Sequence, residues 1–191
     1  MRMLPNLLSL GRIFCGPLVI MLLALQSQTA LAFTIVVMLI SEASDLADGH
    51  IARRYSATSS FGKIVDPLAD SLYRAMVFLA FLDAGWMPLW MVAIIVSRDI
   101  LVSYLRIFSQ QNGITLSARM SGKIKAVVQG VIQIATVMAF FIFGLHPEAW
   151  VSSLVYAGLL IATLVTAWSA VDYTIGFLRS VDIRDTVANK G

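Results

Sequence analysis

The feature that most constrains this chain is a succession of six long apolar segments, with very short breaks between the first and second, the third and fourth, and the fifth and sixth. A helix needs about 20 apolar residues to cross the hydrocarbon core of a bilayer, and only helices and closed barrels satisfy every backbone polar group there. We therefore predict an all-α integral membrane protein with six transmembrane helices in a single domain over residues 1–191. The segments run roughly over Leu4–Leu25, Ala30–Ser44, Ile64–Leu82, Met87–Phe108, Ile124–Leu145 and Trp150–Leu178.

Two of these segments need a comment on where their helices end. The second is interrupted by acidic residues and is expected to continue as a helix to about Arg54. The sixth is followed by a polar tail, residues 180–191, which we expect to be a frayed end because chain termini are poorly ordered unless something holds them.

The composition excludes several classes of protein. Of the 191 residues, 59% are hydrophobic and 13% are charged, against roughly 25% charged in an ordinary soluble domain. Such a chain is neither disordered nor a water-soluble globule. Its net charge of +3 is too small to indicate a nucleic-acid partner. The single Cys15 cannot close an intramolecular disulfide, which excludes a secreted disulfide scaffold.

The basic residues predict the orientation in the membrane. They fall near the N-terminus, in alternate loops and near the C-terminus, whereas the three intervening loops carry no Lys or Arg. By the positive-inside rule, both termini and the two basic loops face the cytoplasm. The alternative is a cleaved signal peptide, with Ile13–Leu25 as its apolar region. Twelve of the 14 Lys and Arg residues follow this distribution, and the other two, Arg74 and Arg98, lie within apolar segments; the twelve are Arg2, Arg12, Arg53, Arg54, Lys63, Arg106, Arg119, Lys123, Lys125, Arg179, Arg184 and Lys190.

Four aspartates lie where the second segment ends and the third begins. Asp45 and Asp48 share one helical face, and so do Asp66 and Asp70. A short loop makes the two helices neighbours, so the four carboxylates can converge near the cytoplasmic surface. Their mutual repulsion would be relieved by hard divalent cations such as Mg²⁺, Mn²⁺ or Ca²⁺, and a pair of metal ions suits phosphoryl transfer. Alternatively, the aspartates cap helix ends or pair with nearby basic residues.

The residues between the aspartates fit a nucleotide-phosphate site. Gly49 and Ala52 remove side-chain bulk on the aspartate face, and Gly62 does the same where the third segment begins or simply allows a tight turn. Arg53 can hold a diphosphate with its fork of donors. A different class of function, a divalent-cation transporter, would also use clustered aspartates. It is less favoured because the carboxylates gather at one surface and no internal repeat is evident.

The stretch Ser44–Asp70 matches the pattern D-x2-D-G-x2-A-R-x8-G-x3-D-x3-D at all eight specified positions. This pattern is the signature of the CDP-alcohol phosphotransferase (CDP-alcohol phosphatidyltransferase) family, which the chain therefore resembles. Within the family it is most similar to phosphatidylglycerophosphate synthases. That likeness extends to LPNLLSLGRI at the start, to SRDILVSYLR over 97–106 and to GKIKAVVQ over 122–129.

The resemblance implies a homodimer in a prokaryotic cytoplasmic (inner) membrane, with a cytoplasm-facing site for two metal ions, Mg or Mn, and a CDP-diacylglycerol donor. It implies that Asp45, Asp48, Asp66 and Asp70 ligate the metals and that Asp70 is also the general base. The residues implied to line the site for the cytidine diphosphate group are Gly49, Ala52, Arg53 and Gly62. An acceptor hydroxyl would attack the phosphatidyl phosphorus and release CMP.

The acceptor is set by residues outside the signature. Glycerol 3-phosphate carries a phosphate that needs cations, and the candidates are Arg98, Arg106, Arg119, Lys123 and Lys125. An inositol phosphate would use the same charges, and phosphatidylglycerol, giving cardiolipin, is a further alternative. The loop could also be basic only because it is cytoplasmic.

The chain departs from the synthase pattern at a few positions. Ser71 replaces the usual lysine and Ala126 the usual threonine. Glu42 and Arg74 are also outside the motif, and we expect Glu42 to pair with Arg74 or Arg98 inside the bundle.

Overall fold

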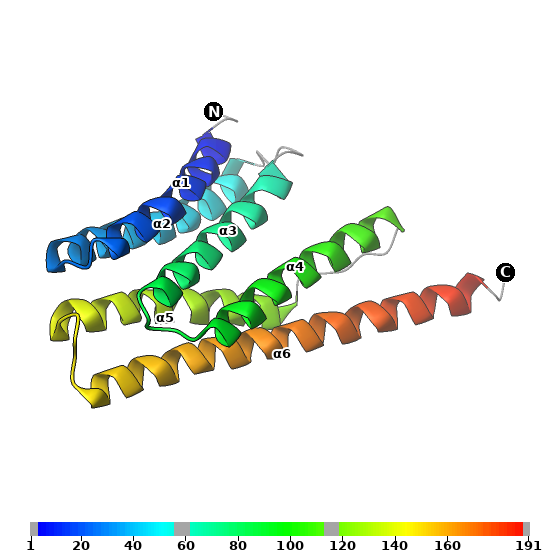
Figure 1. Ribbon diagram of the computed structural model, residues 1–191. Helices are drawn as coiled ribbons and strands as arrows, with labels where there is room; N and C mark the ends of the chain where they lie inside the picture. The colour runs from blue at the N-terminus through cyan, green and yellow to red at the C-terminus, as the bar shows by residue number, and fades with distance from the viewer. Residues whose placement is uncertain (1–3, 56–61, 113–118, 189–191) are drawn as a thin grey trace.

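The computed structural model describes the backbone of residues 4–55, 62–112 and 119–188, and the side chains of 11–44, 67–112 and 119–181. These ranges form six α-helices and contain no strand (Figure 1). The predicted all-α class and the number of helices are therefore confirmed for the described chain. The helices are α1 (Leu4–Ala24), α2 (Gln28–Tyr55), α3 (Gly62–Asp83), α4 (Leu89–Gln111), α5 (Met120–Phe143) and α6 (Ala149–Ala188).

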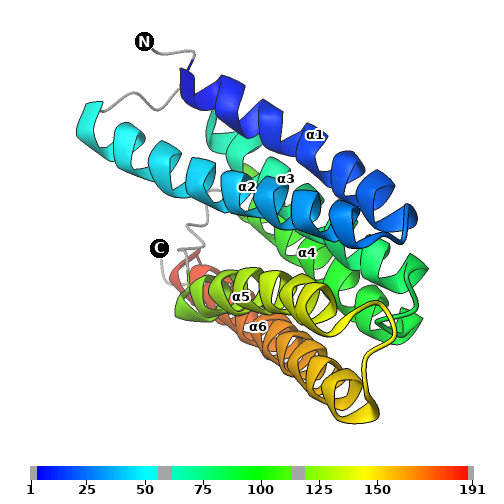
Figure 2. The same cartoon turned by 90° about the vertical axis from the view of Figure 1, so that its left-hand side faces the viewer.

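The helices alternate in direction and form two groups. In the first, α1 packs against α2 and α3; in the second, α6 packs against α4 and α5 (Figures 1 and 2). Contacts of α5 with α2, and of α3 with α4, join the groups. The first residues of α1, α3 and α5 lie at one end of the bundle, which we call the charged end. The short connections 25–27, 84–88 and 144–148 lie at the other, the turn end.

The core centres on α3. Its residues Tyr73, Val77 and Phe81 follow one another at four-residue spacing and are 0–1% exposed, as expected for one face of a helix. Met91 and Ile95 of α4 belong to the same buried cluster. At the turn end the cluster is extended by aromatic rings, because Trp86 stacks on Phe140 with ring centroids 3.8 Å apart.

Along the buried face of α5, polarity rises toward the charged end. Val137 and Phe140 are buried apolar residues, whereas the preceding positions of the same face are buried and polar. Those positions are Ser121, Lys125, Gln129 and Gln133. Such a face has to meet polar partners, because a buried polar group without a hydrogen bond costs free energy.

The buried face of α6 changes in the same way. Toward the turn end this face carries the apolar residues Val155 and Leu159. Toward the charged end it carries Thr166, Ser169 and Tyr173, and all five residues are 0–8% exposed. The two polar faces lie side by side, since Gln129 Nε2 donates to Thr166 Oγ1 at 2.9 Å. The fold thus holds an apolar core at the turn end and a polar interior at the charged end.

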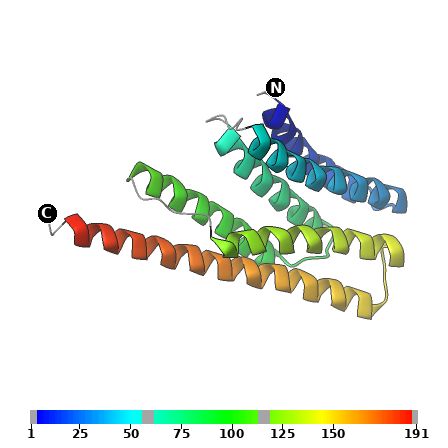
Figure 3. The ribbon, with the colours of Figure 1, turned by 180° about the vertical axis from the view of Figure 1, so that it is seen from behind.

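Two helix ends bear on the predictions. The second helix ends at Tyr55, which confirms its expected continuation through the aspartates. The frayed end expected from residue 180 is wrong, because α6 continues to Ala188 (Figure 3). No Gly or Pro lies between 180 and 188 to interrupt its backbone hydrogen bonds.

Two of the helices are long and apolar enough to cross a membrane within the described residues. They are α5 over Met120–Phe143 and α6 over Ala149–Val181. Shorter apolar stretches occupy Gly11–Ala24 in α1 and Gln28–Ser44 in α2.

Candidate active site

A pocket of about 250 Å³ lies among α3, α4, α5 and α6 toward the charged end. It brings together Asp70, the predicted base, and all five basic residues that the sequence offered for an acceptor phosphate. Its lining is Pro67, Asp70, Ser71, Arg98, Arg106, Arg119, Gly122, Lys123, Lys125, Ala126 and Tyr173. The two positions that depart from the synthase pattern, Ser71 and Ala126, therefore place short side chains in its wall.

The deepest cations of the pocket share one carboxylate. Lys125 Nζ lies 2.8 Å and 3.0 Å from the two oxygens of Asp99, and Arg98 Nη1 lies 2.9 Å from Oδ1 of the same residue. Arg98 also donates to Ser169 Oγ at 2.7 Å. None of the three charged side chains is more than 10% exposed. The Asp99 carboxylate therefore offsets part of the free-energy cost of burying two cations. Its contact with Lys125 joins α4 to α5, and the contact of Arg98 with Ser169 joins α4 to α6.

A second carboxylate fixes the cation at the start of α5. Arg119 donates from Nε and Nη2 to the two oxygens of Asp172, both at 2.6 Å, and Ser121 Oγ donates to the same carboxylate. These hydrogen bonds raise the pKa of the Arg119 guanidinium above its ordinary value, so this residue remains a fixed positive charge. A bidentate arginine–carboxylate pair also sets the orientation of the guanidinium.

Tyr173 of α6 lies among the cations. Its hydroxyl accepts hydrogen bonds from Arg106 Nη2 at 2.8 Å and from the backbone N–H of Arg119 at 3.2 Å. The guanidinium carbons of Arg98 and Arg106 lie 5.4 Å and 5.2 Å from its ring centroid, within range of cation–π attraction. Gly122 permits this arrangement, because a Cβ there would lie 2.9 Å from the tyrosine hydroxyl.

The sequence did not reveal three of these residues. Asp99 and Asp172 had no predicted role, and Tyr173 was not considered. Their signal was present in the polar faces of α5 and α6, whose buried positions cannot be solvated by water. The pocket and its anchors hold five cationic side chains and three carboxylates, counting Asp70, so their net charge is +2. An anionic ligand suits such a site.

The remaining predicted site residues can be placed only on their helices. Asp45, Asp48, Gly49, Ala52 and Arg53 belong to α2, while Gly62 and Asp66 belong to the start of α3. The side chains of these residues lie outside the described ones, so the convergence of the four carboxylates stays a prediction. Within the described side chains, no group of three or more His, Cys, Asp or Glu residues could hold a metal ion.

Asp70 is the one signature aspartate whose side chain is described. It is 29% exposed and accepts a hydrogen bond from Arg74 Nε at 3.0 Å through Oδ1. The expected pairing of Glu42 is confirmed with Arg74, whose Nη1 lies 3.1 Å from Glu42 Oε1. Arg98, the other candidate partner, pairs with Asp99 instead.

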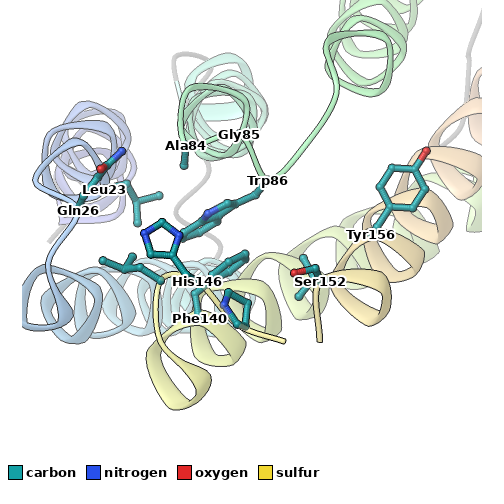
Figure 4. Close-up of a pocket in the computed structure, with 12 residues that line it drawn as sticks. Leu23, Gln26, Ala84, Gly85, Trp86, Phe140, His146, Ser152 and Tyr156 are labelled. Carbon is teal, nitrogen blue, oxygen red and sulfur yellow. The ribbon is translucent and has the colours of Figure 1, made fainter. Parts of the chain in front are cut away.

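A larger pocket, of about 580 Å³, lies at the turn end (Figure 4). Its wall includes Trp86, Phe140, His146 and Tyr156 and contains no Lys, Arg, Asp or Glu. It offers neither fixed cations for a phosphate nor a carboxylate for proton transfer. The smaller pocket at the charged end is therefore the candidate active site.

The helical bundle and its cationic pocket define a protein suited to phosphorylated substrates. The chain belongs to the CDP-alcohol phosphatidyltransferase family, whose sequence profile matches residues 2–171. This result confirms the resemblance seen in the signature over 44–70.

Several curated relatives share the name CDP-diacylglycerol–glycerol-3-phosphate 3-phosphatidyltransferase. The protein of Pectobacterium atrosepticum is 30% identical over 174 residues, which cover 89% of this chain and 92% of that protein. The protein of Rickettsia typhi is 31% identical over 129 residues, or 68% and 72% of the two chains. That of Bacillus subtilis is 35% identical over 94 residues, and the match spans about half of each chain, 49%.

The shared carboxylate predicts a large loss of stability when it is neutralised. In Asp99→Asn, Lys125 and Arg98 stay buried without a compensating negative charge, so the free energy of unfolding should fall by about 3–5 kcal/mol. The matched control is Asp83→Asn, because Asp83 is exposed at the end of α3 and its loss should cost less than about 0.5 kcal/mol. Thermal unfolding in detergent micelles measures both. Equal unfolding curves for the two variants would contradict the shared role of Asp99.

Proposed function

We propose that this chain transfers the phosphatidyl group of CDP-diacylglycerol to the hydroxyl of glycerol 3-phosphate, forming phosphatidylglycerol phosphate and releasing CMP. The observation that carries the proposal is the pocket itself, where Asp70 and five cationic side chains line one cavity. Family membership and the shared name of the curated relatives support the choice of donor and acceptor.

In the proposed reaction the cationic side chains bind the acceptor phosphate and so direct its hydroxyl toward Asp70. All five cations line the pocket, and the carboxylates of Asp99 and Asp172 hold three of them, Arg98, Lys125 and Arg119, in place. Asp70 accepts the hydroxyl proton as the oxygen forms its bond to the phosphatidyl phosphorus. The bond from that phosphorus to the CMP oxygen breaks, and CMP leaves as an anion.

We further propose that two divalent ions, Mg²⁺ or Mn²⁺, are held by Asp45, Asp48, Asp66 and Asp70. Carboxylate oxygens are the ligands that hard cations prefer. Asp70 fits this role because its partly exposed carboxylate lies in the pocket wall. Bound metal ions would neutralise the diphosphate of the donor and the charge on departing CMP.

The donor headgroup would be bound by the other signature residues. Gly49, Ala52 and Gly62 would let the cytidine diphosphate approach the helix backbones, and Arg53 would contact its phosphates. The donor then arrives from the lipid and the acceptor from water, so the site must lie near a membrane surface.

For the membrane arrangement, we propose that all six helices span the cytoplasmic membrane, with both termini and the charged end in the cytoplasm. Each helix has at least 21 residues, which corresponds to about 31 Å or more along its axis and matches a hydrocarbon core of about 30 Å. The basic residues of the pocket lie at the proposed cytoplasmic end, in agreement with the positive-inside rule. A homodimer is proposed from family resemblance alone.

The reaction is tested by supplying purified protein with CDP-diacylglycerol, Mn²⁺ or Mg²⁺ and one acceptor at a time. We expect CMP release with glycerol 3-phosphate and none with inositol phosphate, phosphatidylglycerol or no acceptor, and we expect chelation with EDTA to abolish it. Release with only another acceptor would reassign the substrate. No release with any acceptor, in protein that binds metal, would refute the enzyme and favour a transporter.

The base role of Asp70 predicts a loss of turnover without a loss of fold. Asp70→Asn should lower the rate of CMP release by about 10²–10⁴-fold, the usual contribution of a positioned base, while metal-dependent binding of CDP-diacylglycerol persists. Asp83→Asn again serves as control, since Asp83 is exposed and lies at the far end of the same helix. Unchanged turnover in Asp70→Asn would remove this residue from the base role.

The acceptor site predicts a separable effect on KM. Arg106→Gln removes a pocket cation and should raise KM for glycerol 3-phosphate about 10–100-fold, as expected for a lost hydrogen bond to a charged group. The KM for CDP-diacylglycerol should stay within about twofold, because Arg106 is outside the donor signature. Arg179→Gln is the matched control, an exposed arginine of α6 outside the pocket lining. A rise in the donor KM alone would contradict the assignment.

A further inference from the structure

Three charged side chains form a connected group between α2 and α3, next to the active-site pocket. Arg74 is at its centre and is 4% exposed. Its Nε donates to Asp70 Oδ1 at 3.0 Å, while Nη1 and Nη2 lie 3.1 Å and 3.4 Å from the two oxygens of Glu42. One guanidinium thus contacts the signature carboxylate through one nitrogen and a second carboxylate, outside the signature, through the other two.

Two residues of α5, Gln133 and Gly130, lie against Arg74. Gln133 of α5 donates through Nε2 to the Arg74 carbonyl oxygen at 2.9 Å. At Gly130, also on α5, a Cβ would lie 2.8 Å from Arg74 Nη1 and 3.1 Å from Glu42 Oε1. The absence of a side chain at Gly130 therefore leaves the space that the guanidinium and Glu42 occupy. Three helices fix the group.

The charges of the group explain why two carboxylates are needed. A guanidinium paired with Asp70 alone would give a pair of zero net charge, and its own positive charge would repel a cation bound there. Glu42 supplies a second negative charge, so the three side chains together carry a net charge of −1. The group as a whole can then still attract a cation, while Arg74 fixes the direction of the Asp70 carboxylate through Oδ1.

We propose that Arg74 is a positioning residue that orients the Asp70 carboxylate for proton transfer and metal binding, and that Glu42 offsets the charge of Arg74 so that the group of three side chains keeps one net negative charge to attract a cation. The inference rests on the proposed function, in which Asp70 is the base. It differs from a purely structural salt bridge between α2 and α3, because such a bridge needs only the Glu42–Arg74 contact and not the contact to Asp70.

A charge swap separates the two roles. The double variant Glu42→Arg/Arg74→Glu retains an ion pair between α2 and α3 but places a carboxylate, four residues away, beside Asp70. If Arg74 positions Asp70, the swap keeps a melting temperature close to that of the unaltered protein while kcat falls at least about tenfold, the equivalent of losing one hydrogen bond to a charged group. The KM for glycerol 3-phosphate stays within about threefold, because the cationic pocket is untouched.

A conservative variant covers the case in which the swapped pair does not fold. Arg74→Lys keeps the positive charge, but a single ammonium cannot contact two carboxylates with the fixed fork of a guanidinium. We expect kcat to fall about tenfold here as well, with the fold retained. A kcat within twofold of the unaltered protein, in Arg74→Lys or in a folded swap variant, would overturn the proposal and leave a salt bridge that only joins helices.

Metal binding gives a readout independent of turnover. In Glu42→Gln the charge of Arg74 is no longer offset, so Mn²⁺ affinity, measured by electron paramagnetic resonance, should fall about tenfold; in the swap it should be unchanged or higher. Unchanged Mn²⁺ affinity in Glu42→Gln would overturn the role of Glu42. Failure of the proposed function itself is distinguishable, because the unaltered protein would then release no CMP from CDP-diacylglycerol with any acceptor.

Discussion

The interaction on which the rest of the structure depends is the sharing of Asp99 by Lys125 and Arg98. A lysine buried in an apolar bundle is costly unless a carboxylate is buried with it. Because the three residues come from α4 and α5, and Arg98 reaches on to Ser169 of α6, satisfying these charges fixes how three helices meet. Arg98 and Lys125 also line the pocket. The contacts that offset the cost of burying these cations therefore also build the site for an anion.

The contrast between the two ends of the bundle follows from this arrangement. At the turn end, stacked aromatic rings such as Trp86 on Phe140 complete an ordinary apolar core. At the charged end, the buried faces of α5 and α6 carry hydroxyls, amides and charges that find partners in one another and on α3 and α4. The larger of the two pockets lies at the apolar turn end, whereas the candidate active site lies at the polar charged end. In this fold, the charges of the lining and not the volume of the pocket identify the candidate active site.

The sequence predicted most of the architecture because it rests on local patterns. Apolar segments of spanning length gave six helices, and the spacing of the signature led to the family, which the comparison confirmed. Glu42 was predicted to pair with Arg74 or Arg98, and the structure shows the pair with Arg74. The roles of Asp99, Asp172 and Tyr173 were missed because each depends on a partner on another helix or loop: Lys125, Arg119 and Arg106 lie 26, 53 and 67 residues away from them. Such pairings depend on helix packing, which periodicity does not encode.

The length of α6 has a mechanical consequence. A helix of 40 residues is about 60 Å long, roughly twice the thickness of the hydrocarbon core. Its last turns follow Asp172 and Tyr173 in the sequence, and the rear view shows the C-terminal end of α6 projecting past the end of α4 (Figure 3). Because α6 is one continuous helix, a displacement of its last turns is transmitted to Asp172 and Tyr173. The C-terminal turns are therefore mechanically coupled to the site.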